Sequence, residues 1–177
     1  MAGGPVRFYV GDMTTPQLSD STPRAADFPR AMKRMGALQA EIDAGPITPR
    51  LSHLVKLRAS QINGCAFCID MHITEGLRDG IDQRTLDLVS VWAEIDRFDA
   101  REQAALALTE SMTLVAETHV PRAVFDAAAA VFSEEELGAL VWQIIAINAW
   151  NRMCVTLRAT PGSMAAEAAA EPAGATA

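Results

Sequence analysis

An all-α domain is the fold class that this sequence predicts, and three observations support the prediction. Apolar residues recur at the spacing of one helix face, as Met35, Leu38 and Ile42 do. Residues that cap helices stand at the starts of several such segments. No segment alternates apolar and polar residues as a half-buried strand does. We therefore expect a bundle of about six to seven helices.

The expected helices follow one another through most of the chain. The first begins at Pro29 and closes at Gly45. Thr48 caps the second, with Pro49 in its first position, where a missing N–H costs nothing. The expected set occupies residues 29–44, 48–62, 65–78, 82 onward, 99–117, 121–131 and 133–157.

The later helices carry capping residues at their starts. Asp82 opens the fourth. Asp99 is followed three residues later by Glu102, which is the spacing of a capping box. Ser133 and Glu136 repeat this spacing. These pairs predict where the fifth helix and the last helix begin.

The ends of the chain differ in composition from its middle. Residues 1–24 carry three prolines among polar residues, so we expect an extended arm there. Residues 25–160 hold the expected helical domain. Residues 161–177 are rich in Ala, Glu and Gly and low in complexity, so we expect a tail without a catalytic role.

The composition argues against two classes of partner. The chain has 177 residues, half of them hydrophobic, and a net charge of −7. Its basic residues are scattered, whereas phosphate binding needs a dense basic surface. No apolar run approaches the roughly 18 residues that a membrane span requires. We therefore expect neither nucleic acid nor a membrane as partner.

The cysteines indicate a reducing compartment. Three cysteines are too few for the disulfide framework of a small secreted domain, and residues 1–30 contain no apolar run of signal-peptide length. We therefore expect a cytoplasmic location, where a CxxC pair is more often catalytic or metal-binding than structural. Cys154 lies in an apolar helix with no cysteine near it in sequence, which predicts an inert buried thiol.

The strongest chemical signal is the pair Cys65 and Cys68, separated by two residues and followed by His72. On a helix, these three positions share one face. Asn63-Gly64 favours a tight turn that delivers the pair to a helix start, where unpaired N–H groups stabilise a thiolate. If one sulfur is oxidised to a sulfenic acid, the other can condense with it to a disulfide. An external dithiol must then reduce that disulfide.

Two histidines are candidates for proton transfer. His72 follows Cys68 by four residues, so its ring can approach that sulfur, take its proton and return one to a leaving alkoxide or hydroxide. His53 lies twelve residues before Cys65, on the preceding helix. The spacing does not decide whether that helix folds back against the next. If it does, His53 could face the dithiol.

One long segment resembles a known family. The run from Leu54 to His72 reads LVKLRASQINGCAFCIDMH and resembles the core of the AhpD-like alkylhydroperoxidases, which belong to the carboxymuconolactone decarboxylase superfamily. The later segment 147–152 resembles their last helix. The similarity covers roughly residues 28–160 and is closest to the short, single-domain members. The family's all-α fold agrees with the helices expected from caps and periodicity.

The resemblance implies a role for each of four residues. Cys68 matches the peroxidatic thiol, Cys65 the resolving thiol and His72 the proton-relay histidine. His53 stands where the family has its relay glutamate. A neutral histidine can pass protons but supplies no fixed negative charge. The replacement predicts a relay that is weakened, retuned in pH or redirected to another task.

The resemblance implies a thiol-dependent peroxidase that acts on organic peroxides or hydrogen peroxide. A lipoyl-type dithiol or another thiol carrier would reduce it, and no haem, flavin or metal would be needed. Two alternatives stay open. One is a dithiol oxidoreductase or redox sensor with weak peroxidase activity, and the other is a zinc site built from the same two cysteines and two histidines. The resemblance also implies a homo-oligomer, with a hexamer favoured over a trimer.

Overall fold

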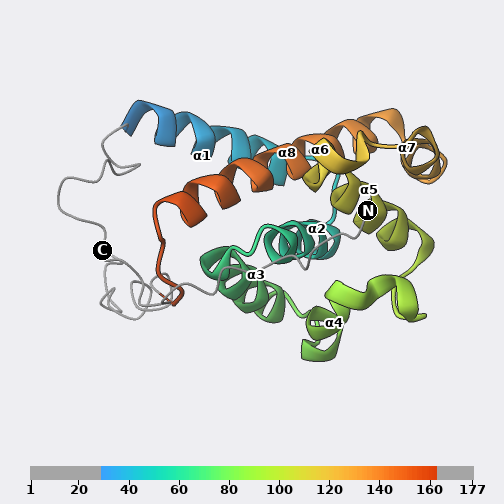
Figure 1. Ribbon diagram of the computed structural model, residues 1–177, viewed down its shortest axis with the longest axis horizontal. Helices are drawn as coiled ribbons and strands as arrows, with labels where there is room; N and C mark the ends of the chain where they lie inside the picture. The colour runs from blue at the N-terminus through green and yellow to red at the C-terminus, as the bar shows by residue number, and fades with distance from the viewer. Residues whose placement is uncertain (1–28, 163–177) are drawn as a thin grey trace, which may run out of the picture.

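The computed structural model describes residues 29–162, and every regular element in that range is a helix (Figure 1). The predicted all-α class is therefore confirmed. The expected arm at residues 1–24 and nearly all of the expected tail lie outside the described residues. The elements are α1 (Pro29–Asp43), α2 (Pro49–Ile62), α3 (Ala66–Arg78), α4 (Gln83–Leu88), the 3₁₀ helix η2 (Val89–Glu94), α5 (Ala100–Thr113), α6 (Val115–Thr118), α7 (Arg122–Ala129) and α8 (Glu134–Thr156).

The predicted caps form as the sequence indicates. The Thr48 side chain accepts the backbone N–H of Leu51 at 3.3 Å. Asp99 and Ser133 each form a complete capping box with the acidic residue three positions later. Each cap satisfies backbone donors that a helix start would otherwise leave without partners. The starts of α2, α5 and α8 are thus fixed by local sequence.

Two helices end earlier than the periodicity predicts. The expected fifth helix breaks at Leu114, because the Thr118 hydroxyl donates to the Ser111 carbonyl at 2.6 Å and so occupies an acceptor that a continuous helix would use. The expected fourth helix tightens into η2 after Leu88, and Val91 leaves the helical region altogether (φ −122°, ψ 26°). Neither change alters the helical class.

Helix α2 is the centre of the fold. It packs against α3, α5 and α8, and α8 runs above α2 and α3 in the view of Figure 1. Leu54, Val55 and Leu57 on α2 are fully buried, and they belong to two different apolar clusters. Burial of a leucine or valine side chain contributes about 1.5–3 kcal/mol, so α2 is held on both sides. Within residues 29–162, no helix combines the length and apolar character needed to cross a membrane.

Candidate active site

The dithiol lies at the junction of a tight turn and a helix start. Gly64 adopts φ +63°, a left-handed conformation that glycine reaches without steric cost. Cys65 is the N-cap of α3, and its sulfur accepts the backbone N–H of Cys68 at 3.4 Å. The two sulfurs form a disulfide, with their Cα atoms 5.4 Å apart. The sequence placed the pair correctly, although Cys65 precedes the helix rather than lying in it.

Buried amides connect this turn to α8. The Asn63 amide donates to the side-chain oxygens of Asn148 at 3.0 Å and Asn151 at 2.9 Å. Asn151 in turn donates to the Ser60 hydroxyl at 3.0 Å, and it is fully buried. Buried side-chain networks whose hydrogen bonds are satisfied fix one relative position of the elements they join. The network therefore holds α8 against the turn that carries the cysteines.

Cys68 and His72 line a common cavity of about 520 Å³ between α1, α3 and α8. Cys65 is not among the described residues that line this cavity. Apolar side chains make up most of the wall: Met32, Phe67, Met71, Ile147, Trp150 and Met153. Both sulfurs are almost completely buried, so the cavity is the route by which a small molecule would meet Cys68.

His72 is held as a neutral base. Its Nδ1 lies 3.1 Å from a carboxylate oxygen of Glu75, so Nδ1 carries the hydrogen and Nε2 carries the lone pair. That Nε2 is buried and has no hydrogen-bond partner in the described structure. Burial lowers the pKa of His72 below its usual 6.5, against the opposing effect of Glu75. The hydrogen bond from His72 lowers the pKa of Glu75, which stays ionised.

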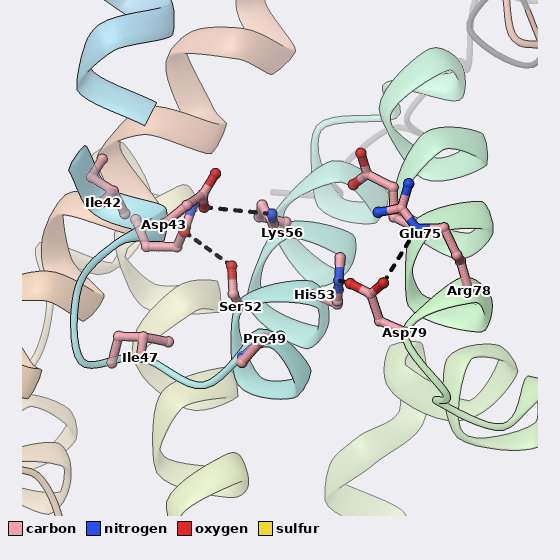
Figure 2. A pocket seen from close by; sticks show the side chains of 11 residues that line it. Ile42, Asp43, Ile47, Pro49, Ser52, His53, Lys56, Glu75, Arg78 and Asp79 are labelled. Carbon is pink, nitrogen blue, oxygen red and sulfur yellow. Dashed lines mark hydrogen bonds and ion pairs between the residues drawn. The ribbon is translucent and has the colours of Figure 1, made fainter. Parts of the chain in front are cut away.

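His53 makes a second histidine–carboxylate pair in a neighbouring cavity of about 230 Å³. Figure 2 shows its ring pointing at Asp79, whose oxygen lies 2.8 Å from Nε2. This hydrogen bond, with a weaker one from Arg78, lowers the pKa of Asp79. The other ring nitrogen, Nδ1, is buried and without a hydrogen-bond partner in the described structure.

The structure answers whether His53 faces the dithiol. It does not line the cavity that contains Cys68, but side-chain ligand atoms of His53, His72 and Glu75 lie within 4.8 Å of one another. His53 therefore meets the imidazole and not the sulfurs. The carboxylate that His53 lacks is supplied to His72 from within α3, by Glu75.

Three residues of this site were missed in the sequence. Glu75 follows His72 by three positions on α3, and Asp79, the C-cap of that helix, follows it by seven, so both lie on the same side of the helix as His72. That spacing was available as a signal, but it also fits an ordinary solvated helix face. The third residue, Lys56, lines both cavities, and its Nζ lies 4.0 Å from an Asp43 oxygen. Burial is the main cause that lowers the pKa of His72, and the positive charge of Lys56 lowers it further.

Potential metal ligands fall into two separate groups. Among the described residues, one group is His53, His72 and Glu75, and the other consists of three cysteines. Neither group mixes sulfur with nitrogen. The Cys2His2 zinc set that the sequence left open is therefore not assembled in this structure, because its four ligand atoms do not converge.

Comparisons with known proteins agree on one family. The sequence profile described as the carboxymuconolactone decarboxylase family matches residues 26–111. The chain is similar to the uncharacterised protein YdfG of Bacillus subtilis strain 168, with 34% identity over 129 residues, which is 73% of this chain and 88% of that protein. The residues that the profile matches include the cysteine segment on which the resemblance rests.

Solved structures share the fold. A protein of unknown function from Agrobacterium tumefaciens, named provisionally as the antioxidant defence protein AhpD, is 40% identical with a TM-score of 0.75, over 77% of this chain and 94% of that one. The debrominase Bmp8 has 21% identity and a TM-score of 0.68, over 77% of this chain and 73% of its own. An AhpD-core protein from Ralstonia eutropha JMP134 has 19% identity, the same TM-score and the same coverage. The last two likenesses establish the fold alone.

Proposed function

Because this chain belongs to the carboxymuconolactone decarboxylase family, we propose that it is a thiol-dependent peroxidase that uses the Cys65–Cys68 dithiol. One observation carries the proposal: Cys68 and a neutral, carboxylate-anchored His72 line the same cavity. That cavity, at about 520 Å³, has the size of a small-molecule site. Its apolar wall favours organic hydroperoxides over hydrogen peroxide.

In the proposed oxidation, His72 Nε2 takes the proton of the Cys68 thiol. The Cys68 thiolate attacks the terminal oxygen of the peroxide, and the O–O bond breaks as the S–O bond forms. The leaving alkoxide takes the proton from His72 and departs as an alcohol. Cys68 is then a sulfenic acid. A base positioned in this way typically contributes a factor of about 10²–10⁴ to the rate.

Resolution returns the site to the disulfide state that the structure contains. The Cys65 thiol attacks the sulfur of the Cys68 sulfenic acid, a disulfide forms, and hydroxide leaves with the thiol proton as water. An external dithiol of the lipoyl type then reduces the disulfide by two thiol exchanges and becomes a disulfide itself. The protein is thereby restored for another turnover.

Glu75 supplies the fixed anion in this proposal. In the family pattern a glutamate occupies the position of His53, whereas here Glu75 accepts from His72 Nδ1 over 3.1 Å. An ionised carboxylate at Nδ1 fixes the tautomer that leaves Nε2 free to accept a proton, and it stabilises the imidazolium that forms. The relay is thus relocated to α3, and His53 is not required as its anion.

The test is peroxide consumption with dihydrolipoamide as donor. Wild-type protein should consume cumene hydroperoxide faster than hydrogen peroxide, and Cys68→Ser should lower the rate to the uncatalysed background. Arg78→Met is the matched control, because Arg78 lines only the neighbouring cavity. An unchanged rate in Cys68→Ser, with Arg78→Met also unchanged, would refute the proposal.

A dithiol oxidoreductase or redox sensor is the second candidate, and the engagement of His53 with Asp79 favours it. That interaction engages His53 Nε2 with a carboxylate outside the cavity of Cys68, so peroxide turnover would be slow while disulfide exchange remained fast. His53→Glu separates the two functions. A many-fold gain in peroxidase rate would identify the native histidine as a handicap for peroxide reduction, and no gain would favour the relocated relay.

We also propose a cytoplasmic homo-oligomer, with a hexamer favoured over a trimer. Trp142 and Ile145 lie on one face of α8 and are 52% and 42% exposed, which is unusual for such large apolar side chains. A second copy of the chain would cover them. Sedimentation equilibrium of the wild type and of Trp142→Ser would test this, and a wild-type monomer would refute it.

A further inference from the structure

A third sulfur lies beside the dithiol. The Sγ atoms of Cys65, Cys68 and Cys154 lie within 4.8 Å of one another, and all three residues are buried. Phe67 and Met153 pack around them. The expected burial of Cys154 is correct, but its isolation in sequence concealed its neighbours. A thiol this close to a dithiol can form or exchange a disulfide with it, whereas a lone buried thiol has no sulfur to react with.

The fold holds Cys154 in this place. Cys154 follows Asn151 by three residues, so both lie on one face of α8. Asn151 is bonded to Asn63 and Ser60, next to the turn that carries Cys65. The amide network that fixes the cysteine turn thus also fixes the third sulfur. Its position is a consequence of the packed core and not of a mobile surface.

The cavity gives Cys154 an advantage that Cys65 lacks. Cys68 and Cys154 both line the 520 Å³ cavity, whereas Cys65, the N-cap of α3, is not among the described residues that line it. A sulfenic acid formed on Cys68 would therefore have two thiols close to it, those of Cys65 and Cys154. Disulfide sulfurs are about 2.05 Å apart, so side-chain rotation must bring to that distance two sulfurs that are at most 4.8 Å apart.

We propose that Cys154 is a second resolving thiol for Cys68. This inference rests on the proposed function. The Cys154 thiol attacks the sulfur of the Cys68 sulfenic acid, the S–O bond breaks, and hydroxide leaves with the thiol proton as water. The Cys68–Cys154 disulfide forms, and Cys65 remains a free thiol. Cys65 then attacks Cys154 or Cys68 by thiol–disulfide exchange, or the external dithiol reduces the bond directly.

The two resolving thiols differ in speed. Burial raises the pKa of the Cys154 thiol, so less of it is ionised at neutral pH. The Cys65 sulfur, by contrast, accepts a backbone N–H at the helix start, which stabilises its thiolate. Because Cys65 is also the residue whose sulfur is bonded to Cys68 in this structure, it resolves first in the wild type, and Cys154 protects Cys68 from irreversible oxidation when Cys65 is unavailable.

The test uses Cys65→Ser oxidised with one equivalent of cumene hydroperoxide. After blocking of free thiols and digestion with trypsin, mass spectrometry should find residues 59–78 joined to residues 153–158 through Cys68 and Cys154. The matched control is Cys65→Ser combined with Cys154→Ser, which should label with dimedone at Cys68 about tenfold more strongly. Equal dimedone labelling in both variants would overturn the inference. Cys65→Ala serves if the serine variant does not fold.

Diamide distinguishes failure of the inference from failure of the proposed function. Diamide removes two hydrogens from a pair of neighbouring thiols and needs no peroxide. A Cys68–Cys154 disulfide that forms with diamide but not with peroxide would support the pairing and count against the peroxidase. Failure with both oxidants would refute the pairing. Formation of the bond between two chains, seen as a doubled mass under non-reducing conditions, would also refute it.

Discussion

Two neighbouring cavities of this protein differ in the polarity of their walls. The larger, of about 520 Å³, is walled by methionine, aromatic and aliphatic side chains and reaches Cys68. The smaller, of about 230 Å³, is polar and contains no cysteine (Figure 2). Asp43, Lys56 and Glu75 line both cavities and so form a shared wall.

The two cavities separate thiol chemistry from the ionisable groups that control the protonation of His72. The cysteines and most of the apolar surface lie on one side of the shared wall, and His53, Arg78 and Asp79 lie on the other. His72 connects them, since its ring lines the apolar cavity while its Nδ1 reaches Glu75 in the wall. A charged group in contact with the buried sulfurs would be costly to desolvate. A carboxylate in contact with His72 instead can still set the protonation state of the imidazole.

Substitution of His72, which connects the two cavities, should have the largest effect on peroxide turnover. His72→Gln keeps a polar side chain but cannot exchange a proton near neutral pH, so peroxide turnover should fall about 10²–10⁴-fold. Steady-state assays with dihydrolipoamide would measure this. The corresponding change in the polar cavity, His53→Gln, should alter the rate far less. Similar losses in both variants would mean that the two cavities act as one relay.

Neutralising the wall carboxylate should come next. Glu75→Gln removes the anion that fixes the His72 tautomer, and we expect a loss of about tenfold. The same change removes the interaction that raises the pKa of His72, so that pKa should fall further. A lower pKa keeps the imidazole neutral to lower pH, and the acid limb of the pH–rate profile should move down. Movement to higher pH would contradict this assignment.

Changing the wall of the apolar cavity should alter selectivity. Met153→Gln places an amide where a thioether lines the cavity, and it should lower the preference for cumene hydroperoxide over hydrogen peroxide about fivefold, equivalent to about 1 kcal/mol. The ratio of kcat/KM values for the two peroxides measures it. Arg78→Met, in the polar cavity, should leave the ratio unchanged. A shift in both variants would mean that substrate enters through either cavity.

Substitution of Lys56, the cation of the shared wall, should have the smallest effect on the rate. It should shift the pH–rate profile in the direction opposite to Glu75→Gln. The positive charge of Lys56 adds to burial in lowering the pKa of His72, so Lys56→Met should raise that pKa. In the wild type the acid limb should lie below pH 6.5, and in the variant it should move upward, with a loss of less than about twofold at neutral pH. A titration of turnover from pH 5 to 8 would reveal both shifts. Coinciding profiles for wild type and variant would exclude Lys56 from the site.

The sequence predicted the parts of the fold that depend on neighbouring residues. The caps at Thr48, Asp99 and Ser133 formed as expected, because a cap needs only backbone donors within three positions. The break at Leu114 was not predicted, since it depends on a hydroxyl four residues away that competes with the helix. Apolar periodicity continues across Leu114 and therefore does not indicate the break.

Local spacing alone predicts a dithiol at a helix start with an imidazole four residues beyond it, because one helical turn fixes those distances. The contact of Cys154 with this pair, the pairing of His53 with Asp79 and the wall shared by two cavities exist only in the folded chain. Those pairings come from helices packed through buried faces and amides. Periodicity says that a face is buried, but it does not say which partner buries it.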